Sequence, residues 1–126
     1  MIFAFATDDG RNLINRHFGD ANFYQIYKIT KNSYSKIDSL ENTTEEEDQH
    51  ADPKKAGGIA NLLQSKNVTC AVSTVFGPNI KRINKKFVCI IASSKDISTQ
   101  INTLQQNFSQ IQAAWHQGVN RKHLKL

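Results

Sequence analysis

The stretch Ile2-Phe3-Ala4-Phe5-Ala6-Thr7-Asp8-Asp9-Gly10 opens the chain and decides its fold class. Successive side chains of a strand point to opposite faces, and both faces of residues 2–7 are mainly apolar. A strand of this kind lies in the middle of a sheet that is covered on both sides. Asp8-Asp9-Gly10 then ends the strand, because Asp and Gly favour tight turns. We therefore expect a layered α/β domain with residues 2–7 at its centre.

Four further segments have the composition of strands. Residues 22–29 and 34–40 contain several aromatic and β-branched side chains, and the polar residues 31–33 between them predict a hairpin turn. The weak alternation of residues 34–40 is typical of a sheet edge. Residues 68–75 and 87–92 are apolar on both faces, so we expect them to be buried like the first strand.

Three helices are predicted between and after these strands. Asp52 and Pro53 suit the cap and first turn of a helix that Asn67 closes. Gly77-Pro78 opens a short second helix. The third helix is predicted from about residue 96 to residue 117. Its single apolar stripe comprises Ile97, Ile101, Leu104, Phe108, Ile111 and Trp115.

The order of these elements predicts a five-stranded mixed sheet with helices on both faces. Right-handed crossovers place the strands, numbered along the chain, in the order 3-2-1-4-5. The chain leaves the first and fourth strands in opposite directions, and α/β sheets bind ligands beyond the strand ends at such a switch point. The loops of residues 7–19 and 74–79 meet there. We expect an anion- or cluster-binding crevice lined by Thr7, Asp8, Asp9, Gly10, His17, Phe18, Gly19, Gly77, Pro78 and Asn79.

His17 is the candidate metal ligand of this predicted crevice. A neutral imidazole binds metal ions and a protonated one pairs with anions. The alternative is that His17 hydrogen-bonds its own loop and holds the loop's shape. Gly77 would let a ligand approach the start of the second helix, where N–H groups and the helix dipole favour negative charge. Gly77-Pro78 is also ordinary chemistry for starting a helix, so both interpretations stay open.

The last helix is long for so small a domain. A helix of residues 96–117 would extend about 30 Å, which exceeds what the predicted sheet can cover. The overhang with Ile111 and Trp115 either meets a second copy of the chain, giving a homodimer, or folds back on its own domain. Residues 119–126 are expected to be a frayed basic tail.

Length and composition suit one soluble domain. The chain has 126 residues, enough for a single core, and no apolar run approaches the roughly 20 residues that cross a membrane. The amino terminus lacks the basic leader of a secretory signal, so we expect a cytoplasmic protein. Cys70 and Cys89 lie in apolar strands, which predicts reduced core thiols rather than a disulfide.

Charge is unevenly distributed along the sequence. Acidic residues concentrate in residues 41–52, and basic residues concentrate in residues 81–86 and 121–125. The net charge of +5 permits an anionic partner without requiring one. His50 lies in the acidic stretch and could bind a divalent ion loosely, although a solvated loop is the simpler interpretation.

Several motifs together resemble the dinitrogenase iron–molybdenum cofactor biosynthesis family. The resemblance covers about residues 1–108. It depends on residues 2–10, His17-Phe18-Gly19-Asp20-Ala21, Phe23-Tyr24-Gln25-Ile26-Tyr27, the helix with Ala56 and Leu62, and the Gly77-Pro78 turn.

The resemblance implies a ribonuclease-H-like three-layer α/β/α fold. It also implies a non-catalytic protein that binds or carries an iron–sulfur or iron–molybdenum cofactor, or a precursor. The sequence has no paired-cysteine motif that would hold a cluster firmly, so we expect few protein ligands and loose binding. Cofactor-assembly proteins are the implied partners. Residues 1–108 form the cofactor-biosynthesis-like domain in this interpretation, and residues 109–126 are a helical extension and basic tail of the same domain.

The residues also bear on two other functions. Nucleases of the ribonuclease-H-like fold hold metal ions with a set of carboxylates, one of them from the first strand. The interior of residues 2–7 has no acid, so we do not expect nuclease activity. The second alternative is a nucleic-acid or protein interaction module that uses the basic residues and the last helix, although nucleic acid is not the expected partner.

Overall fold

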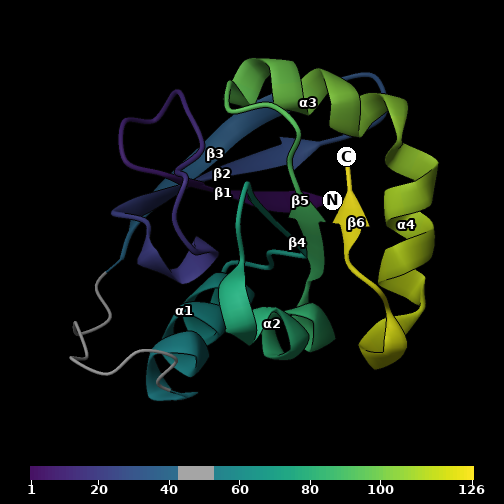
Figure 1. Ribbon diagram of the computed structural model, residues 1–126. Helices are drawn as coiled ribbons and strands as arrows, with labels where there is room; N and C mark the ends of the chain where they lie inside the picture. The colour runs from purple at the N-terminus through teal and green to yellow at the C-terminus, as the bar shows by residue number, and fades with distance from the viewer. Residues whose placement is uncertain (43–52) are drawn as a thin grey trace.

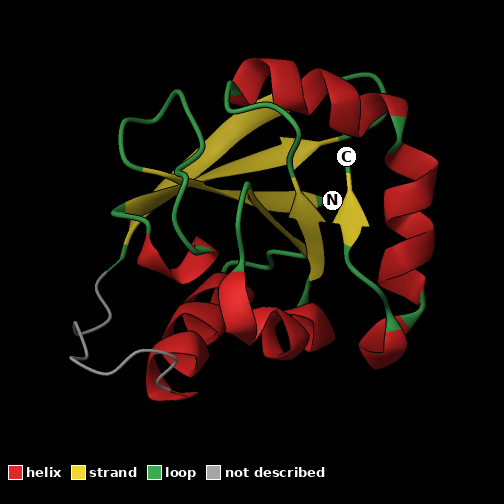
Figure 2. Cartoon of the chain, viewed as in Figure 1, coloured by secondary structure: helices red, strands yellow, loops and turns green. Residues whose placement is uncertain are grey.

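The centre of the protein is a six-stranded mixed sheet, seen in a computed structural model that describes residues 1–42 and 53–126 (Figures 1 and 2). The order is β3-β2-β1-β4-β5-β6. The strands are β1 (Ile2–Thr7), β2 (Phe23–Ile29), β3 (Tyr34–Glu41), β4 (Cys70–Ser73), β5 (Val88–Ile91) and β6 (Leu124–Lys125). The predicted order of the first five strands is confirmed, with β3 at an edge. The predicted number of five is wrong, because the carboxyl terminus adds a sixth.

Strand direction places the predicted site. β1 runs antiparallel to β2 and parallel to β4, so that Phe5 is paired with both Gln25 and Val72. β5 and β6 continue the parallel part of the sheet. The carboxyl ends of β1 and β4 therefore lie side by side at one edge, and the loops that follow them start from neighbouring positions.

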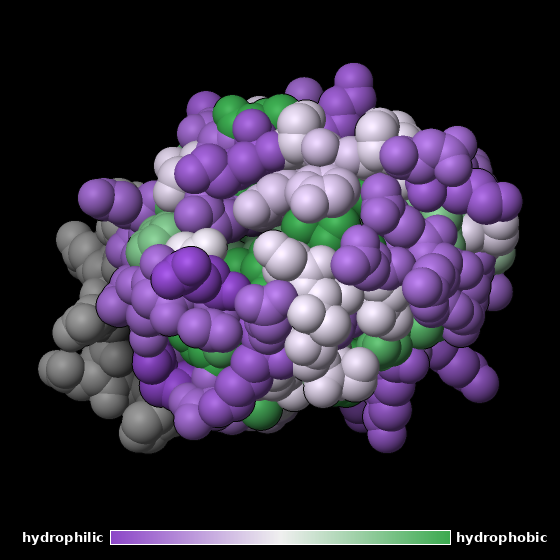
Figure 3. Space-filling view, turned by 90° about the horizontal axis from the view of Figure 1, so that it is seen from above, coloured by the Kyte–Doolittle hydropathy of each residue, from purple (hydrophilic) through white to green (hydrophobic). Residues whose placement is uncertain are grey.

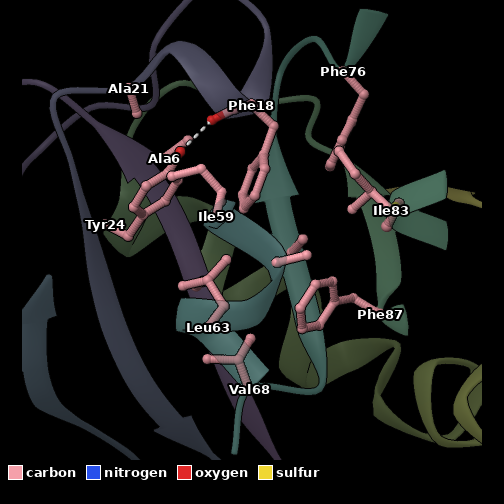
Figure 4. Packing of buried hydrophobic residues seen from close by; sticks show 14 of the residues in the cluster. Ala6, Phe18, Ala21, Tyr24, Ile59, Leu63, Val68, Phe76, Ile83 and Phe87 are labelled. Atoms are coloured by element: carbon pink, nitrogen blue, oxygen red, sulfur yellow. Dashed lines mark hydrogen bonds between the residues drawn. The ribbon is translucent and has the colours of Figure 1, made fainter. Parts of the chain in front are cut away.

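One face of the sheet is covered by α1 (Pro53–Ser65) and α2 (Ile80–Lys86). Figure 4 shows this side of the core, where Leu63 and Ile83 pack with aromatic rings from the strands and loops. Asn67 closes α1 as predicted, with a φ of 63°. The N–H of Val68 donates to the carbonyl of Leu63 at 3.2 Å, which is the bond of a Schellman motif. Glu41, the first residue of the acidic stretch, is the last residue of β3, whereas residues 43–52, with His50 and the predicted cap Asp52, lie outside the described residues.

The opposite face is covered by two helices where one was predicted. α3 (Ile97–Gln106) and α4 (Phe108–His116) meet at Asn107, whose φ of −112° and ψ of 22° are not helical. α4 turns away from the line of α3 and runs beside the far edge of the sheet (Figure 1). Ile111 is fully buried there. The prediction of a single helix is therefore wrong. Of the two alternatives for its second half, folding back on its own domain is the one that the structure shows.

The carboxyl-terminal residues are ordered parts of the fold. η3 (Gly118–Asn120), a single 3₁₀ turn, leads into β6, and the N–H of Leu126 donates to the carbonyl of Ile91 at 3.1 Å. Arg121 is only 6% exposed. The expectation of a frayed tail is wrong, because Arg121 ties this segment to two helices. Apart from the sixth strand, the divided last helix and the ordered tail, the layered α/β/α architecture is as predicted.

Two bulk properties of the chain are the state of its cysteines and the hydropathy of its helices. Cys70 and Cys89 are free and buried, as predicted. Among the described residues, no helix has the length and hydropathy needed to cross a membrane. Figure 3 views the molecule from the α3 side, and hydrophilic residues cover most of that surface.

Candidate functional site

The two predicted loops meet at the carboxyl edge of β1 and β4. His17 forms an isolated parallel bridge with Val75. The hydroxyl of Thr74 donates to the carbonyl of Ile14 at 2.6 Å. The backbones of residues 7–19 and 74–79 are thus joined directly, which confirms that they converge.

The side chain of His17 lies against the backbone of Gly77. A Cβ atom built on Gly77 would be 2.6 Å from Nδ1 and Cε1 of the imidazole and 2.7 Å from its Cγ, far inside contact distance. Gly77 also has a φ of 74°, which disfavours any residue with a Cβ. Glycine is therefore needed here for two reasons. At this point the imidazole fills the space that was predicted to be an open crevice.

The imidazole of His17 is partly open to solvent. Its side chain is 51% exposed, and Nδ1 lies 4.0 Å from Oδ2 of Asp20. No hydrogen bond joins the ring to any residue that the structure describes, so His17 shapes its loop by packing and not by hydrogen bonding. Nδ1, Cε1 and Cγ are the ring atoms nearest to Gly77. Nε2, on the other side of the ring, is therefore the nitrogen farther from this backbone and the candidate atom for binding a metal.

Phe18 anchors the loop that carries His17. Its ring is 1% exposed and stacks on Phe76 with centroids 5.3 Å apart. Tyr24 packs on its other side, and the Tyr24 hydroxyl donates to the Phe18 carbonyl at 2.8 Å (Figure 4). Burial raises the pKa of Tyr24. Phe18 was predicted among the residues that contact the ligand. Because its side chain is buried, it holds the loop in place and does not present a surface to a ligand.

Asp9 organises the turn after β1. Its Oδ1 accepts hydrogen bonds from the N–H groups of Arg11 and Asn12, each at 2.8 Å. These bonds hold the pKa of Asp9 well below its usual range. Thr7 is fully buried, and its hydroxyl accepts from the N–H of Gly10 at 2.9 Å. Thr7, Asp9 and Gly10 therefore build the turn, and a ligand cannot reach the side chain of Thr7.

Asp8 is engaged in the same loop. Its carboxylate receives two bonds from the guanidinium of Arg16, at 2.7 and 3.2 Å, and a third from the N–H of Asn22 at 2.9 Å. The bond from Arg16 is the main cause that lowers the pKa of Asp8. Arg16 also donates to the carbonyl of Asp20 at 2.9 Å. It therefore connects Asp8, directly after β1, with Asp20, three residues after His17.

The helix start in the second loop is a weaker anion site than predicted. η2 (Gly77–Asn79) is a 3₁₀ turn that leads into the seven-residue α2, so little helix dipole accumulates. Pro78 has no N–H to offer. Lys81 and Arg82 lie exposed in the first turn of α2 and supply positive charge nearby.

Gly19 is the second glycine at the site. Its φ is not positive, and a Cβ built on it would meet nothing within 4 Å. Neither backbone conformation nor internal packing therefore requires glycine at this position, in contrast with Gly77.

The donors of this site are few. In the part of the chain that the structure describes, no three side chains of His, Cys, Asp or Glu are grouped so that they could hold a metal ion. Sequence reasoning missed Phe76 and Asp20 as partners of the loop. The aromatic residue before Gly77 was a usable signal, whereas the position of Asp20 beside the imidazole depends on the 3₁₀ turn η1 (Phe18–Asp20).

A family model described as dinitrogenase iron-molybdenum cofactor matches residues 1–107. The chain belongs to the dinitrogenase iron-molybdenum cofactor family. The match includes both loops of the candidate site and ends just before α4. The family connects this protein with the biosynthesis or binding of the iron–molybdenum cofactor. Comparison with curated protein sequences gives no significant match.

Proposed function

We propose that this protein is a non-catalytic carrier of an iron–sulfur or iron–molybdenum cluster, or of a precursor of one. The cluster would bind at the junction of residues 7–19 and 74–79, with Nε2 of His17 as the protein ligand. The observation that carries the proposal is the half-exposed His17 imidazole, which is fixed against Gly77 and free of hydrogen bonds to the described residues.

The surroundings of His17 support a position that is rigid on the protein side and open on the solvent side. Phe18 and the bonds of Asp8 and Asp9 hold the loop from below. Gly19, two residues after His17, has open space within 4 Å of the position that a Cβ atom would take. The exposed groups of Lys81 and Arg82 would favour an anionic cluster.

Few ligands imply loose binding, which suits a carrier. Cys70 and Cys89 cannot assist, because both thiols are fully buried and burial raises the pKa of Cys70 to about 12. A cluster held by one imidazole exchanges readily with a protein that offers more ligands.

The test is anaerobic incubation of the protein with iron, sulfide and molybdate, followed by desalting and visible absorbance. We expect the wild type and His116→Ala to acquire cluster absorbance and His17→Ala to lose most of it. His116 is a suitable control because it is also exposed and lies on α4. Equal absorbance in all three proteins, or none in the wild type, would contradict the proposal.

A further inference from the structure

The two halves of the chain carry opposite charge. Ten of the eleven acidic residues lie at or before Asp52, whereas residues 53–126 contain eleven of the sixteen Lys and Arg residues and a single acid, Asp96. Among the described residues, the acids Asp38 and Glu41 lie on β3 at one edge of the sheet, whereas β4, β5 and β6 form the other half. The half with β4, β5 and β6 is therefore built from a stretch of sequence that is rich in basic residues and has Asp96 as its single acid.

Arg121 gathers two basic segments into one surface. Its guanidinium donates to the carbonyls of Asn84 and Lys85 at the end of α2, at 3.0 and 3.2 Å. It also donates to the carbonyls of Ala114 and Trp115 at the end of α4, at 3.1 and 3.0 Å. The side chain of Asn84 returns a bond to the Arg121 carbonyl. The carboxyl-terminal segment is thus fixed beside α2 (Figure 1).

We name the resulting patch the α2–tail surface and define it by Lys81, Arg82, Lys85 and Lys122. All four residues are exposed. Lys81 and Lys85 are four residues apart on the helix and Arg82 and Lys85 three apart, so their side chains are neighbours. Ile83 turns inward to the core and leaves the charged groups outward. None of the four has an ion-pair partner among the described residues.

We propose that the α2–tail surface, formed where Arg121 fixes the carboxyl-terminal segment beside α2, docks an acidic surface of a partner protein. Charge complementarity selects an acidic partner. Val119, on η3 beside α2, is 66% exposed and supplies an apolar contact of the kind found within protein interfaces. Gly77–Asn79, where His17 packs, leads directly into the first turn of α2, which carries Lys81 and Arg82 of this surface.

A protein partner fits this surface better than nucleic acid does. Four cations release few counterions, so phosphate binding would be weak at physiological salt. The described residues place no exposed aromatic ring on α2 or the tail, where stacking of bases would need one; the exposed Tyr34 lies on β3 at the opposite edge of the sheet. An exposed valine beside lysines is instead suited to a mixed apolar and charged interface.

The test is an NMR titration of the full-length protein with a synthetic oligoglutamate peptide, and separately with single-stranded DNA of equal charge. We expect the peptide to shift amides in residues 80–86 and 118–125. The triple variant Lys81→Glu, Arg82→Glu, Lys85→Glu should weaken peptide binding by more than about tenfold, since it reverses three of the contacting charges. The matched control is Lys28→Glu, Lys31→Glu, Lys36→Glu, which changes net charge equally on β2, β3 and their turn.

Three results would overturn this inference. Equal weakening in the control would show that only net charge matters. Shifts spread over the whole surface would show that no docking site exists. Tighter binding of DNA than of peptide would assign the surface to nucleic acid. The inference does not depend on the cluster, so failure of the His17 experiment would leave this titration interpretable.

Discussion

The imidazole of His17 lies against Gly77 so closely that a Cβ on Gly77 would be 2.6 Å from two ring atoms. This contact joins the loop after β1 to the loop after β4. It also explains why glycine is needed at the start of η2, beyond the ordinary chemistry of helix starts. The half-exposed imidazole is thus held in place without being buried.

The first prediction concerns the two glycines of the site. Gly77→Ala should lower the free energy of unfolding by at least about 1–2 kcal/mol, because the left-handed backbone conformation alone costs that much. The same variant should shift the NMR signals of the His17 ring, since the new methyl group displaces it. Gly19→Ala is the control and should change stability by less than about 0.5 kcal/mol. Equal losses in chemical denaturation would contradict the packing described here.

The second prediction concerns Arg121. Arg121→Ala should lower the free energy of unfolding by about 2–3 kcal/mol, because four helix-end carbonyls lose a charged donor in a buried setting. Arg121→Lys should recover only part of this, since an ammonium group cannot reproduce the planar fork. Lys122→Ala, one residue away and exposed, should have little effect. Urea denaturation compares the four proteins, and a stable Arg121→Ala would restore the idea of a frayed tail.

The third prediction concerns acid pH. Asp8 and Asp9 have pKa values below those of the unfolded chain, so their carboxylates stabilise the fold above about pH 4. That contribution is lost as the pH falls through the lower, folded-state values. The double variant Asp8→Asn, Asp9→Asn should be less stable than the wild type at neutral pH. Its stability should also depend less on pH below about pH 4, in denaturation curves measured at several pH values.

Prediction and structure agree where a pattern of apolar residues fits only one kind of secondary structure and one position in the fold. The strands of residues 2–7 and 68–75 are apolar on both faces, and that pattern alone is enough to place them at the centre. The break at Asn107 was missed because Phe108 and Ile111 continue the spacing of the preceding apolar residues. Both halves of a bent helix satisfy the same period, so the period cannot reveal the bend.

The sixth strand and the details of the site were beyond sequence reasoning for a different reason. β6 has two residues, and its position depends on bonds from Arg121 to carbonyls 36 and 37 residues away in the chain. The convergence of the two loops followed from the strand order. The contact of His17 with Gly77 and the burial of Phe18 were not predicted. Both depend on packing between residues far apart in the sequence, which no local pattern indicates.

The fourth prediction concerns the thiols. Cys70 and Cys89 are fully buried, and burial raises the pKa values of both. A thiol reagent should therefore react with neither in the native protein at neutral pH, and with both after unfolding in urea. Fast reaction of the native protein would show that a thiol reaches the surface, and would reopen the question of cysteine ligands.

The central claim is that His17 itself binds the metal cargo. The most direct measurement is pulsed electron paramagnetic resonance on cluster-loaded protein with ¹⁵N-labelled histidine. The account predicts a nitrogen coupling to the cluster in the wild type and in His116→Ala, and its loss in His17→Ala. A coupling that survives in His17→Ala, or that disappears in His116→Ala, would contradict it.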